Sequence, residues 1–504
     1  MSIATVFSRA QTGMDAPLVS VEVHLSNGLP NFSIVGLPET AVRESKDRVR
    51  AAIINSNFEF PAHLITVNLA PAELPKQGGR FDLAIALGLL IASKQLDETT
   101  IQNYEFLGEL SLSGALRKST GILPAAHACQ CSGNKLITSI ENQQQLIPIN
   151  YTTYFCASHL LDVCAHLNNL KKLVTEPLTS PFQQNSAQAS MSDVYGQQRA
   201  KRALCIAAAG QHHVLMIGSP DSGKSMFASR FPSLLSPLNE TEMLETSSIY
   251  SIANVTGQPR HPQSRPFHSP HHTVSAVGLA GGGSNPKPGE ISLAHNDVLF
   301  LDEFTEFDRR ALEILREPIE SGVITISRAA AQIEFPARFQ LIAAINPCPK
   351  GCDINQYGQC ECSSQQLKRY RNKISAPLLD RIDLQVSVPK LPTRIFFEST
   401  ASCLEDWQQI LTNLDNARLV QMNRQGKPNA RLEGKQIQQI CQLPQEGKQK
   451  ILEMLERLNI SARAFHRILK TSHTIADLDQ SKNIAQKHIS EAMSYRQFDR
   501  LLKT

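Results

Sequence analysis

The segment that most constrains the fold is the loop Gly218–Ser225, which reads GSPDSGKS. It follows a short apolar run, Val214–Ile217, and precedes helix-prone residues that start at Met226. It therefore matches the pattern G-x-x-x-x-G-K-[ST] in the context that this phosphate-binding motif requires, after a strand and at the start of a helix. Strand and helix signals alternate around it from Asp193 to Leu391, which predicts an α/β domain. A glycine turn that arises by chance is the alternative.

A loop of this kind binds a nucleoside triphosphate through its backbone. Its N–H groups and the N-terminus of the next helix surround the phosphates, where the helix dipole favours negative charge. Lys224 can reach the β- and γ-phosphates, the Ser225 hydroxyl can ligate Mg²⁺, and Asp221 tolerates the positive φ that a turn can need. We therefore expect ATP and Mg²⁺ as cofactors. The predicted binding residues are Gly218, Ser219, Pro220, Asp221, Ser222, Gly223, Lys224, Ser225 and Met226.

Two further apolar strands end in polar residues that suit ATP hydrolysis. Val298–Leu301 is followed by Asp302 and Glu303. We expect Asp302 to orient the Mg²⁺ shell and Glu303 to polarise the attacking water. The strand 339–345 ends at Asn346, which can hold that water or sense the γ-phosphate. Each feature alone is typical of a solvated loop or a turn, and the phosphate-binding loop favours the functional interpretation.

The length of 504 residues predicts about three domains at roughly 100–200 residues each. Residues 1–170 alternate strand and helix signals without a phosphate-binding loop, which indicates an α+β domain. Residues 171–190 are polar, contain proline and are interpreted as a linker. The α/β ATPase domain then covers 191–395, and the helical spacing of 396–504 predicts an all-α lid.

The order of the motifs resembles the magnesium-chelatase-like AAA+ ATPases, and among them the ComM/YifB family. The stretches that carry the resemblance are SPHHTVSAVGLAGGGSNPKPGEISLAHNDVLFLDEF, ESGVITISRAAAQIEFPARFQLIAAINPCP and PLLDRIDL. One departure is Asn296-Asp297, where the family usually shows Asn-Gly. The resemblance implies a homo-hexameric ring that drives branch migration of DNA during natural transformation.

The resemblance also implies roles for residues that spacing alone does not identify. Arg381, in LLDRID, corresponds to the arginine finger that a subunit offers to its neighbour's γ-phosphate. Arg463, in SARAFHRILK, corresponds to the sensor that closes the lid over ATP. The next segment reads KTSHTIADL where the family has RVARTIADL, so His473 replaces an arginine and a basic role at this position is in doubt. The expected catalytic residues are Lys224, Asp302, Glu303, Asn346, Arg381 and Arg463.

The first domain resembles the Lon-protease-like, ribosomal-S5-type fold. A Lon protease needs a serine nucleophile that a lysine activates. The corresponding loop, Lys76–Leu83, reads KQGGRFDL and contains no serine. We therefore expect no peptidase activity, and interpret this domain as a platform for assembly or for guiding DNA.

A cluster of cysteines follows Asn346. Of the 11 cysteines, Cys348, Cys352, Cys360 and Cys362 lie close together in the sequence. Four thiolates are the number that a structural Zn²⁺ takes, although the spacing is irregular. Where the family has NPCPCG this chain has Lys350, and Cys352 would take over that ligand role. Free thiols are the alternative. The segment that contains SPHH also offers His268, His271 and His272, which could suggest a second metal site, but we interpret them as loop histidines bonded to backbone.

The charge balance leaves a polyanion partner open. There are 50 Lys and Arg against 46 Asp and Glu, a net charge of +4, so a DNA surface would have to come from local patches. The run 368–373 and the segment 417–435 are basic, and solvated helix faces or subunit contacts are the alternative for both. The resemblance places two pore loops near Lys287 and Arg328. The candidate DNA contacts are Lys287, Arg328, Lys368, Arg369 and Arg371.

Together these features predict an ATP-driven ring motor that acts on single-stranded and branched DNA, with recombinase and competence proteins as partners. A chelatase-type motor that acts on a protein or metal-insertion partner is the first alternative, and an ATP-dependent protease the second. The longest apolar run, Leu83–Ala92, is shorter than the ~18–20 residues that cross a bilayer. We therefore expect a cytoplasmic protein without a membrane partner.

Overall fold

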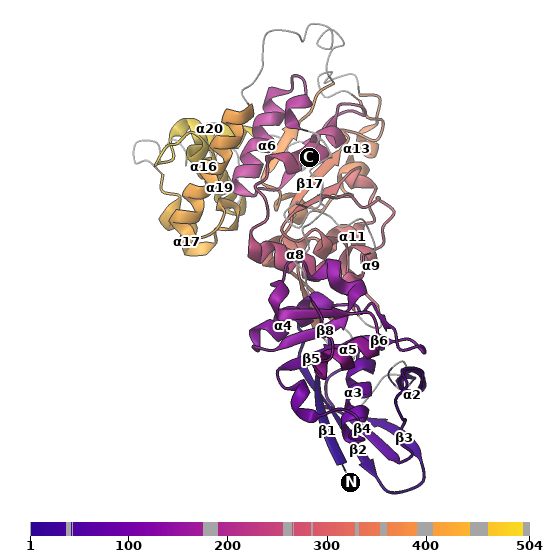
Figure 1. The fold of residues 1–504 in the computed structure, drawn as a ribbon. Coiled ribbons are helices and arrows are strands. Elements are labelled where there is room, and N and C mark those ends of the chain that lie inside the picture. The colour runs from indigo at the N-terminus through magenta and orange to yellow at the C-terminus, as the bar shows by residue number, and fades with distance from the viewer. Residues whose placement is uncertain are drawn as a thin grey trace.

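The computed structural model describes residues 2–36, 42, 44–174, 190–255, 265, 267–283, 286–327, 332–352, 360–390, 407–443 and 462–496. Figure 1 shows an amino-terminal part at one end and an α/β module at the other, with a group of helices beside the module. Arg328 and most of the predicted linker lie outside the described residues. No helix of the described residues is long and apolar enough to span a membrane.

The amino-terminal part contains a four-stranded sheet in the order β1-β2-β4-β3, against which helix α3 (Asp82–Ala92) packs. Alternate residues of β2 (Leu18–Ser26) are buried, as the period-two pattern predicts. Every residue of α3 is buried. A second, parallel sheet has the order β5-β8-β9. The other bounds are β1 Ser2–Arg9, β3 Asn31–Val35, β4 Leu64–Ala70, α2 Ser45–Asn55, β5 Tyr104–Leu107, β8 Lys135–Ser139, β9 Tyr154–Ala157, α4 Ile122–Cys131 and α5 Leu160–Leu167.

The central module is built on a parallel five-stranded sheet in the order β11-β14-β17-β10-β18. The strands β10, β14 and β17 are wholly buried and apolar apart from one glutamine, as strands covered on both faces are. In a parallel sheet all carboxyl ends share one edge, where ligands bind. The bounds are β10 Val214–Ile217, β11 Phe267–His268, β14 Val298–Leu301, β17 Gln340–Ile345 and β18 Leu384–Ser387.

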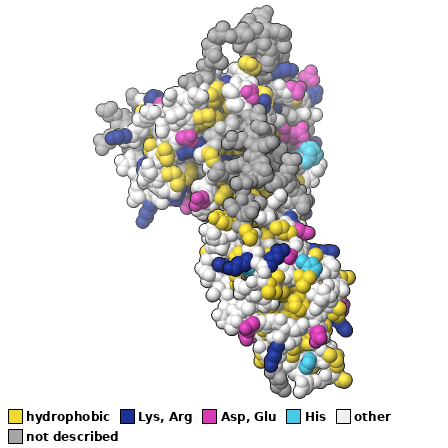
Figure 2. Space-filling view, viewed as in Figure 1, with side chains coloured by type: hydrophobic (Ala, Val, Ile, Leu, Met, Phe, Trp, Pro, Cys, Tyr) yellow, Lys and Arg dark blue, Asp and Glu magenta, His cyan; other side chains and the backbone are white. Residues whose placement is uncertain are grey.

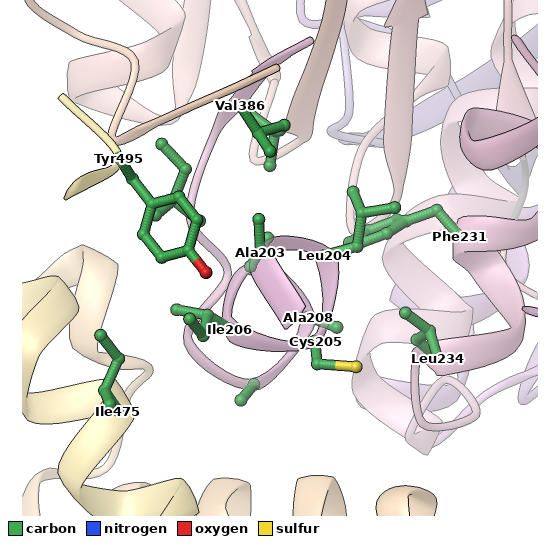
Figure 3. Packing of buried hydrophobic residues seen from close by; sticks show 14 of the residues in the cluster. Ala203, Leu204, Cys205, Ile206, Ala208, Phe231, Leu234, Val386, Ile475 and Tyr495 are labelled. Atoms are coloured by element: carbon green, nitrogen blue, oxygen red, sulfur yellow. The ribbon is translucent and has the colours of Figure 1, made fainter. Parts of the chain in front are cut away.

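The carboxyl-terminal helices share a core with the module. Helix α6 (Gln198–Gly210) presents Ala203, Leu204 and Ile206 to a cluster that also contains Ile475 and Tyr495, as Figure 3 shows. Because this apolar cluster is continuous, the helices form one packed body with the module. Their bounds are α16 Trp407–Gln425, α17 Gly434–Ile440, α19 Ala462–Leu478 and α20 Gln486–Ser494.

The amino-terminal part contacts the module through helices α4 and α8 (Glu240–Ala253), which lie side by side in Figure 1. The N–H of Gly121 donates to the carbonyl of Ser251 at 3.0 Å, and the N–H of Leu123 donates to Oγ of Ser251 at 3.3 Å. Leu244 of α8 packs against the apolar cluster under α4. A second contact places Gly13 against Ile333, in the hairpin of β15 (Val323–Ser327) and β16 (Gln332–Pro336).

Candidate nucleotide site

The predicted phosphate-binding loop lies between the end of β10 and helix α7 (Lys224–Arg230). The Lys224 ammonium donates to the carbonyls of Gly218 and Ser219, both at 2.8 Å, and to Oδ1 of Asn346 at 3.2 Å. These contacts use all three donors of the ammonium. Burial lowers the pKa of Lys224, and the nearby carboxylates, Asp302 first, oppose that shift. Lys224 therefore ties the loop to the end of β17, where Asn346 lies.

The backbone of the loop explains its sequence. Asp221 has φ 61 and Gly223 has φ 91, so both are in the left-handed region. Asp is one of the few residues besides glycine that adopts this region, as expected here. At Gly218 a Cβ atom would lie 2.3 Å from the carbonyl oxygen of Val388, so any side chain would displace backbone. The loop thus needs glycine at Gly218 for space and at Gly223 for conformation.

The two residues that we expect to hold Mg²⁺ are in direct contact. The Ser225 hydroxyl donates to Oδ2 of Asp302 at 2.6 Å. Both side chains present hard oxygen atoms, which Mg²⁺ prefers. The chemistry of this pair fits a Mg²⁺ ion that also contacts the phosphates.

Glu303 follows on a left-handed turn with φ 49, and its side chain is 56% exposed. Its Oε2 lies 3.2 Å from Nδ1 of His272. The SPHH histidines contact side chains: besides this pair, His268 Nδ1 lies 3.1 Å from Oε2 of Glu290. The interpretation of these histidines as backbone-bonded loop residues was therefore wrong for His268 and His272.

Arg381 lies at the opposite edge of the sheet from this loop. It precedes β18, which runs parallel to β10, whereas Lys224 follows β10. A four-residue strand such as β10 is ~13 Å long at ~3.3 Å per residue. Arg381 is 7% exposed, and its guanidinium contacts Oε1 of Glu320 at 2.8 Å and the carbonyl of Pro377 at 2.7 Å. Within one chain, Arg381 therefore faces away from the phosphate-binding loop.

Arg463 lines the same cavity as Arg381. This cavity has a volume of about 660 Å³ between the module and the carboxyl-terminal helices, and its lining is rich in Arg and Lys. Arg467 of α19 donates to the carbonyl of Arg381 and to Oδ1 of Asp383, both at 2.6 Å. The described lining includes no residue of the loop 218–225. The structure thus groups the predicted sensor Arg463 with Arg381 and not with Lys224.

His473 cannot take the basic role of the arginine that it replaces. Its side chain is buried in α19, and both ring nitrogens lack a hydrogen-bond partner among the described residues. Burial lowers its pKa to about 4. The imidazole is therefore neutral at pH 7.

The candidate DNA contacts are dispersed. Lys287 is exposed on β13 (Lys287–Pro288), and Lys368 and Arg369 are exposed on α13 (Ser364–Arg371), where Arg371 is half-buried. On the face shown in Figure 2, Lys and Arg side chains of the described residues form small separate groups.

Two arginines of the basic segment 417–435 make contacts within the protein, although much of the segment, including Lys435, is exposed. Arg418 donates to the carbonyls of Ala208 and Leu234, and Arg424 pairs with Asp477 at 2.8 Å. A DNA surface on this segment therefore loses these two arginines. Their charges are used to hold α16 against the module and α19.

The four clustered cysteines come together in space. Their Sγ atoms all lie within 4.8 Å of one another, and they form the one such group of potential metal ligands among the described residues. The N–H of Cys352 donates to Sγ of Cys348 at 3.2 Å. Four sulfur ligands suit a structural Zn²⁺. The loop 353–359 lies outside the described residues.

The chain matches three sequence families along its length. Residues 21–142 match "Subunit ChlI of Mg-chelatase", residues 190–395 match "Magnesium chelatase, subunit ChlI", and residues 405–496 match "Magnesium chelatase, subunit ChlI C-terminal". These matches follow the three parts of the structure. The assignment of the first part to a Lon-protease-like, S5-type fold stays a prediction.

Two relatives are similar to this chain along its full length. The chain is 47% identical over 510 residues to "Competence protein ComM" of Haemophilus influenzae, covering 100% of this chain and 99% of the relative. It is 47% identical over 502 residues to "Uncharacterized protein YifB" of Salmonella typhimurium, covering 100% and 98%. A shorter similarity, 24% over 226 residues, covers 40% of this chain and 25% of "DNA replication licensing factor Mcm6" of Drosophila melanogaster. The chain belongs to the ComM/YifB family of magnesium-chelatase-like AAA+ ATPases.

Proposed function

We propose that this protein is an ATP-driven hexameric ring motor that moves branched DNA and extends heteroduplex during natural transformation. The observation that carries the proposal is the separation of Lys224 and Arg381 on opposite edges of one sheet. An arginine finger placed in this way can stabilise transferred phosphoryl charge only on a neighbouring subunit. ATP would therefore lie between subunits, and hydrolysis would depend on assembly.

Within one subunit, the loop and its neighbours prepare the phosphates for attack. Lys224 and the loop N–H groups bind and orient them, while Ser225 and Asp302 hold the Mg²⁺ ion, which neutralises developing charge. Glu303 accepts a proton from the attacking water once its carboxylate turns from His272 towards that water. Asn346 orients the water or contacts the γ-phosphate from the end of β17.

The neighbouring subunit completes the site. Arg381 has to leave Glu320 to reach the γ-phosphate, and Arg463 in the same cavity supplies a second cation. Arg463 would thus act on the nucleotide of the adjacent subunit. The bonds from Arg467 to Arg381 and Asp383 link the movement of α19 to the position of the finger.

The DNA part of the proposal is supported by two of the similar proteins, a competence protein and a DNA replication licensing factor. The exposed cations Lys287, Lys368 and Arg369 are the proposed phosphate contacts, with Arg371 and Arg328 as further candidates. Single-stranded and branched DNA are the proposed substrates, and recombinase and competence proteins in the cytoplasm the proposed partners. ATP and Mg²⁺ are the cofactors, and Zn²⁺ at the cysteine cluster is the third that we propose.

The test is a junction assay with purified protein. Turnover of ATP should rise with added DNA, and labelled three- and four-way junctions should be resolved in an ATP-dependent way. Lys224→Ala should abolish both activities. Lys368→Ala with Arg369→Ala should lower DNA affinity and reduce the salt slope by about 2 if both contact phosphates. An ATPase that ignores DNA and leaves junctions intact would refute the DNA motor.

A chelatase-type motor is the second candidate, because the matched families are described as magnesium chelatase subunits. This function requires a partner that inserts metal into a tetrapyrrole. Deletion of the gene should then change the cellular tetrapyrrole pool. An unchanged pool would dismiss this candidate and leave the DNA motor untouched.

A further inference from the structure

We propose that the four cysteines hold a Zn²⁺ ion that fixes the position of the sensor Asn346, so that ATP turnover depends on the metal. The inference rests on the proposed ATPase site but not on DNA as its substrate. The Zn²⁺ ion would take no part in the reaction itself, but the loop that binds it contacts the phosphate-binding loop.

The geometry of the cluster suits a single metal ion. A tetrahedral ion with Zn–S bonds of ~2.3 Å brings its sulfur atoms to ~3.8 Å of one another, and here all four lie within 4.8 Å. Cys348 is buried, while Cys360 is exposed, so the ion would be anchored on the module and closed from the solvent side. The Cys352 N–H donates to Sγ of Cys348 at 3.2 Å, which holds these two ligands next to each other.

The chemistry of the donors selects the ion. Thiolates are soft ligands, and a set of four sulfurs in tetrahedral arrangement is typical of zinc or iron–sulfur centres. Hard cations such as Mg²⁺ prefer oxygen ligands, which Ser225 and Asp302 offer. One site of each kind would therefore lie in the same module.

The first link to the nucleotide site is through the loop that joins two of the ligands. Cys348 lies two residues after Asn346, at the end of β17. Gly351 packs against the phosphate-binding loop, since a Cβ atom there would lie 2.6 Å from Cδ of Pro220. Gly351 also has φ 69, which favours glycine. The metal loop thus touches the nucleotide loop directly.

The second link is through helix α13, which begins two residues after Cys362. Its Tyr370 is buried and donates to the carbonyl of Asn346 at 3.1 Å. The same hydroxyl accepts from Oγ1 of Thr305 at 2.9 Å, two residues past Glu303. One phenol therefore connects the sensor strand to the turn that carries the general base.

These links form a closed path. The chain leaves Asn346, passes through the four cysteines and returns as α13 to bond the same residue. The metal would hold the segment between Asn346 and α13 in place, because small metal-bound segments owe their order to the ion. Loss of the ion would release Tyr370 from Asn346 and slow the chemical step, with less effect on ATP affinity.

The experiment uses the full-length protein as purified. Elemental analysis should find about one zinc per chain. Cys360→Ser and Cys362→Ser should lose the zinc and lower kcat for ATP at least tenfold with little change in KM. Tyr370→Phe should keep the zinc and should also lower kcat. Cys131→Ser, which changes an exposed cysteine outside the cluster, should change neither.

Folding defects are separated by reversibility. Removal of zinc from the wild-type protein with a thiol reagent should likewise lower turnover at least tenfold, and reduction with added Zn²⁺ should restore it. A metal-free native protein with full turnover, or cysteine variants without zinc that hydrolyse ATP normally, would overturn the proposal. Iron in place of zinc would overturn the identity of the ion. A zinc-dependent ATPase that ignores DNA would uphold this inference while refuting the DNA motor.

Discussion

Replacing Arg381 by alanine tests whether this arginine acts on ATP bound to its own subunit or on ATP bound to a neighbouring subunit. In one chain, Arg381 and the end of β10 lie on opposite edges of the sheet. At ~13 Å and an effective dielectric constant of ~20, a unit charge contributes only about 1.3 kcal/mol. Salt screens this further, because the separation exceeds the Debye length of ~8 Å. Action within the subunit therefore predicts less than about a tenfold fall in kcat.

Action between subunits predicts a much larger loss. A finger in contact with the transferred group is worth about 10³–10⁵ in kcat, or at least about 4 kcal/mol. ATP turnover of Arg381→Ala at saturating ATP decides between these values. Arg310→Ala, an exposed arginine on α11 (Arg309–Ile314), is the matched control and should behave as wild type.

Mixing two inactive variants makes the test stricter. Arg381→Ala keeps its phosphate-binding loop, and Lys224→Ala keeps its finger. In equal amounts, about a quarter of the interfaces pair an intact loop with an intact finger, so the mixture should regain about a quarter of wild-type turnover. A loss below tenfold in Arg381→Ala, or a mixture no more active than its components, would refute the reasoning.

Three further predictions follow from single residues. Glu303→Gln should keep ATP binding and lower turnover about 10²–10⁴-fold, as measured by nucleotide binding and single-turnover hydrolysis; a fast variant would exclude Glu303 as the base. Glu320→Ala should free Arg381 from a half-exposed ion pair and raise turnover at limiting protein concentration by up to about fivefold, whereas a fall would show that the pair positions the finger. His473 has a folded pKa of about 4, below the ~6.5 of an unfolded histidine, so its contribution to stability is complete above pH ~6.5 and is lost as the pH falls towards 4. His473→Leu should flatten the melting temperature over that range, and an unchanged pH dependence would contradict the assignment.

The sequence was most informative where chemistry is local. The phosphate-binding loop and the strand that precedes it are consecutive, so both the α/β sheet and the neighbourhood of Lys224 could be predicted. The contact of Ser225 with Asp302 agrees with the expectation that both residues serve one Mg²⁺ ion, and it arises because parallel strands end at one edge of the sheet. The mixed α/β module and the carboxyl-terminal helices were also expected, and the structure shows both.

Contacts between distant segments could not be predicted in this way. The basic residues of 417–435 suggested a surface, but the partners that bury Arg418 lie some two hundred positions earlier. Tyr370 lies within the basic run 368–373, and the structure turns it inwards to Asn346. Its neighbours Lys368 and Arg369 are exposed while it is buried. Helical periodicity places Tyr370 on a different face of α13 from Lys368 and Arg369. That periodicity was the signal from which its burial could have been predicted.

The junction between α4 and α8 has a consequence for how the amino-terminal part stays attached to the α/β module. The amino-terminal part is attached by backbone bonds to Ser251 and by packing of Leu244 and Ile333, in addition to the covalent connection through 175–189. A protease that cuts that connection should leave two fragments that elute together. The amino-terminal part would then stay bound to α8 without a peptide connection, and inserting residues between 175 and 189 would leave this contact with the α/β module unchanged.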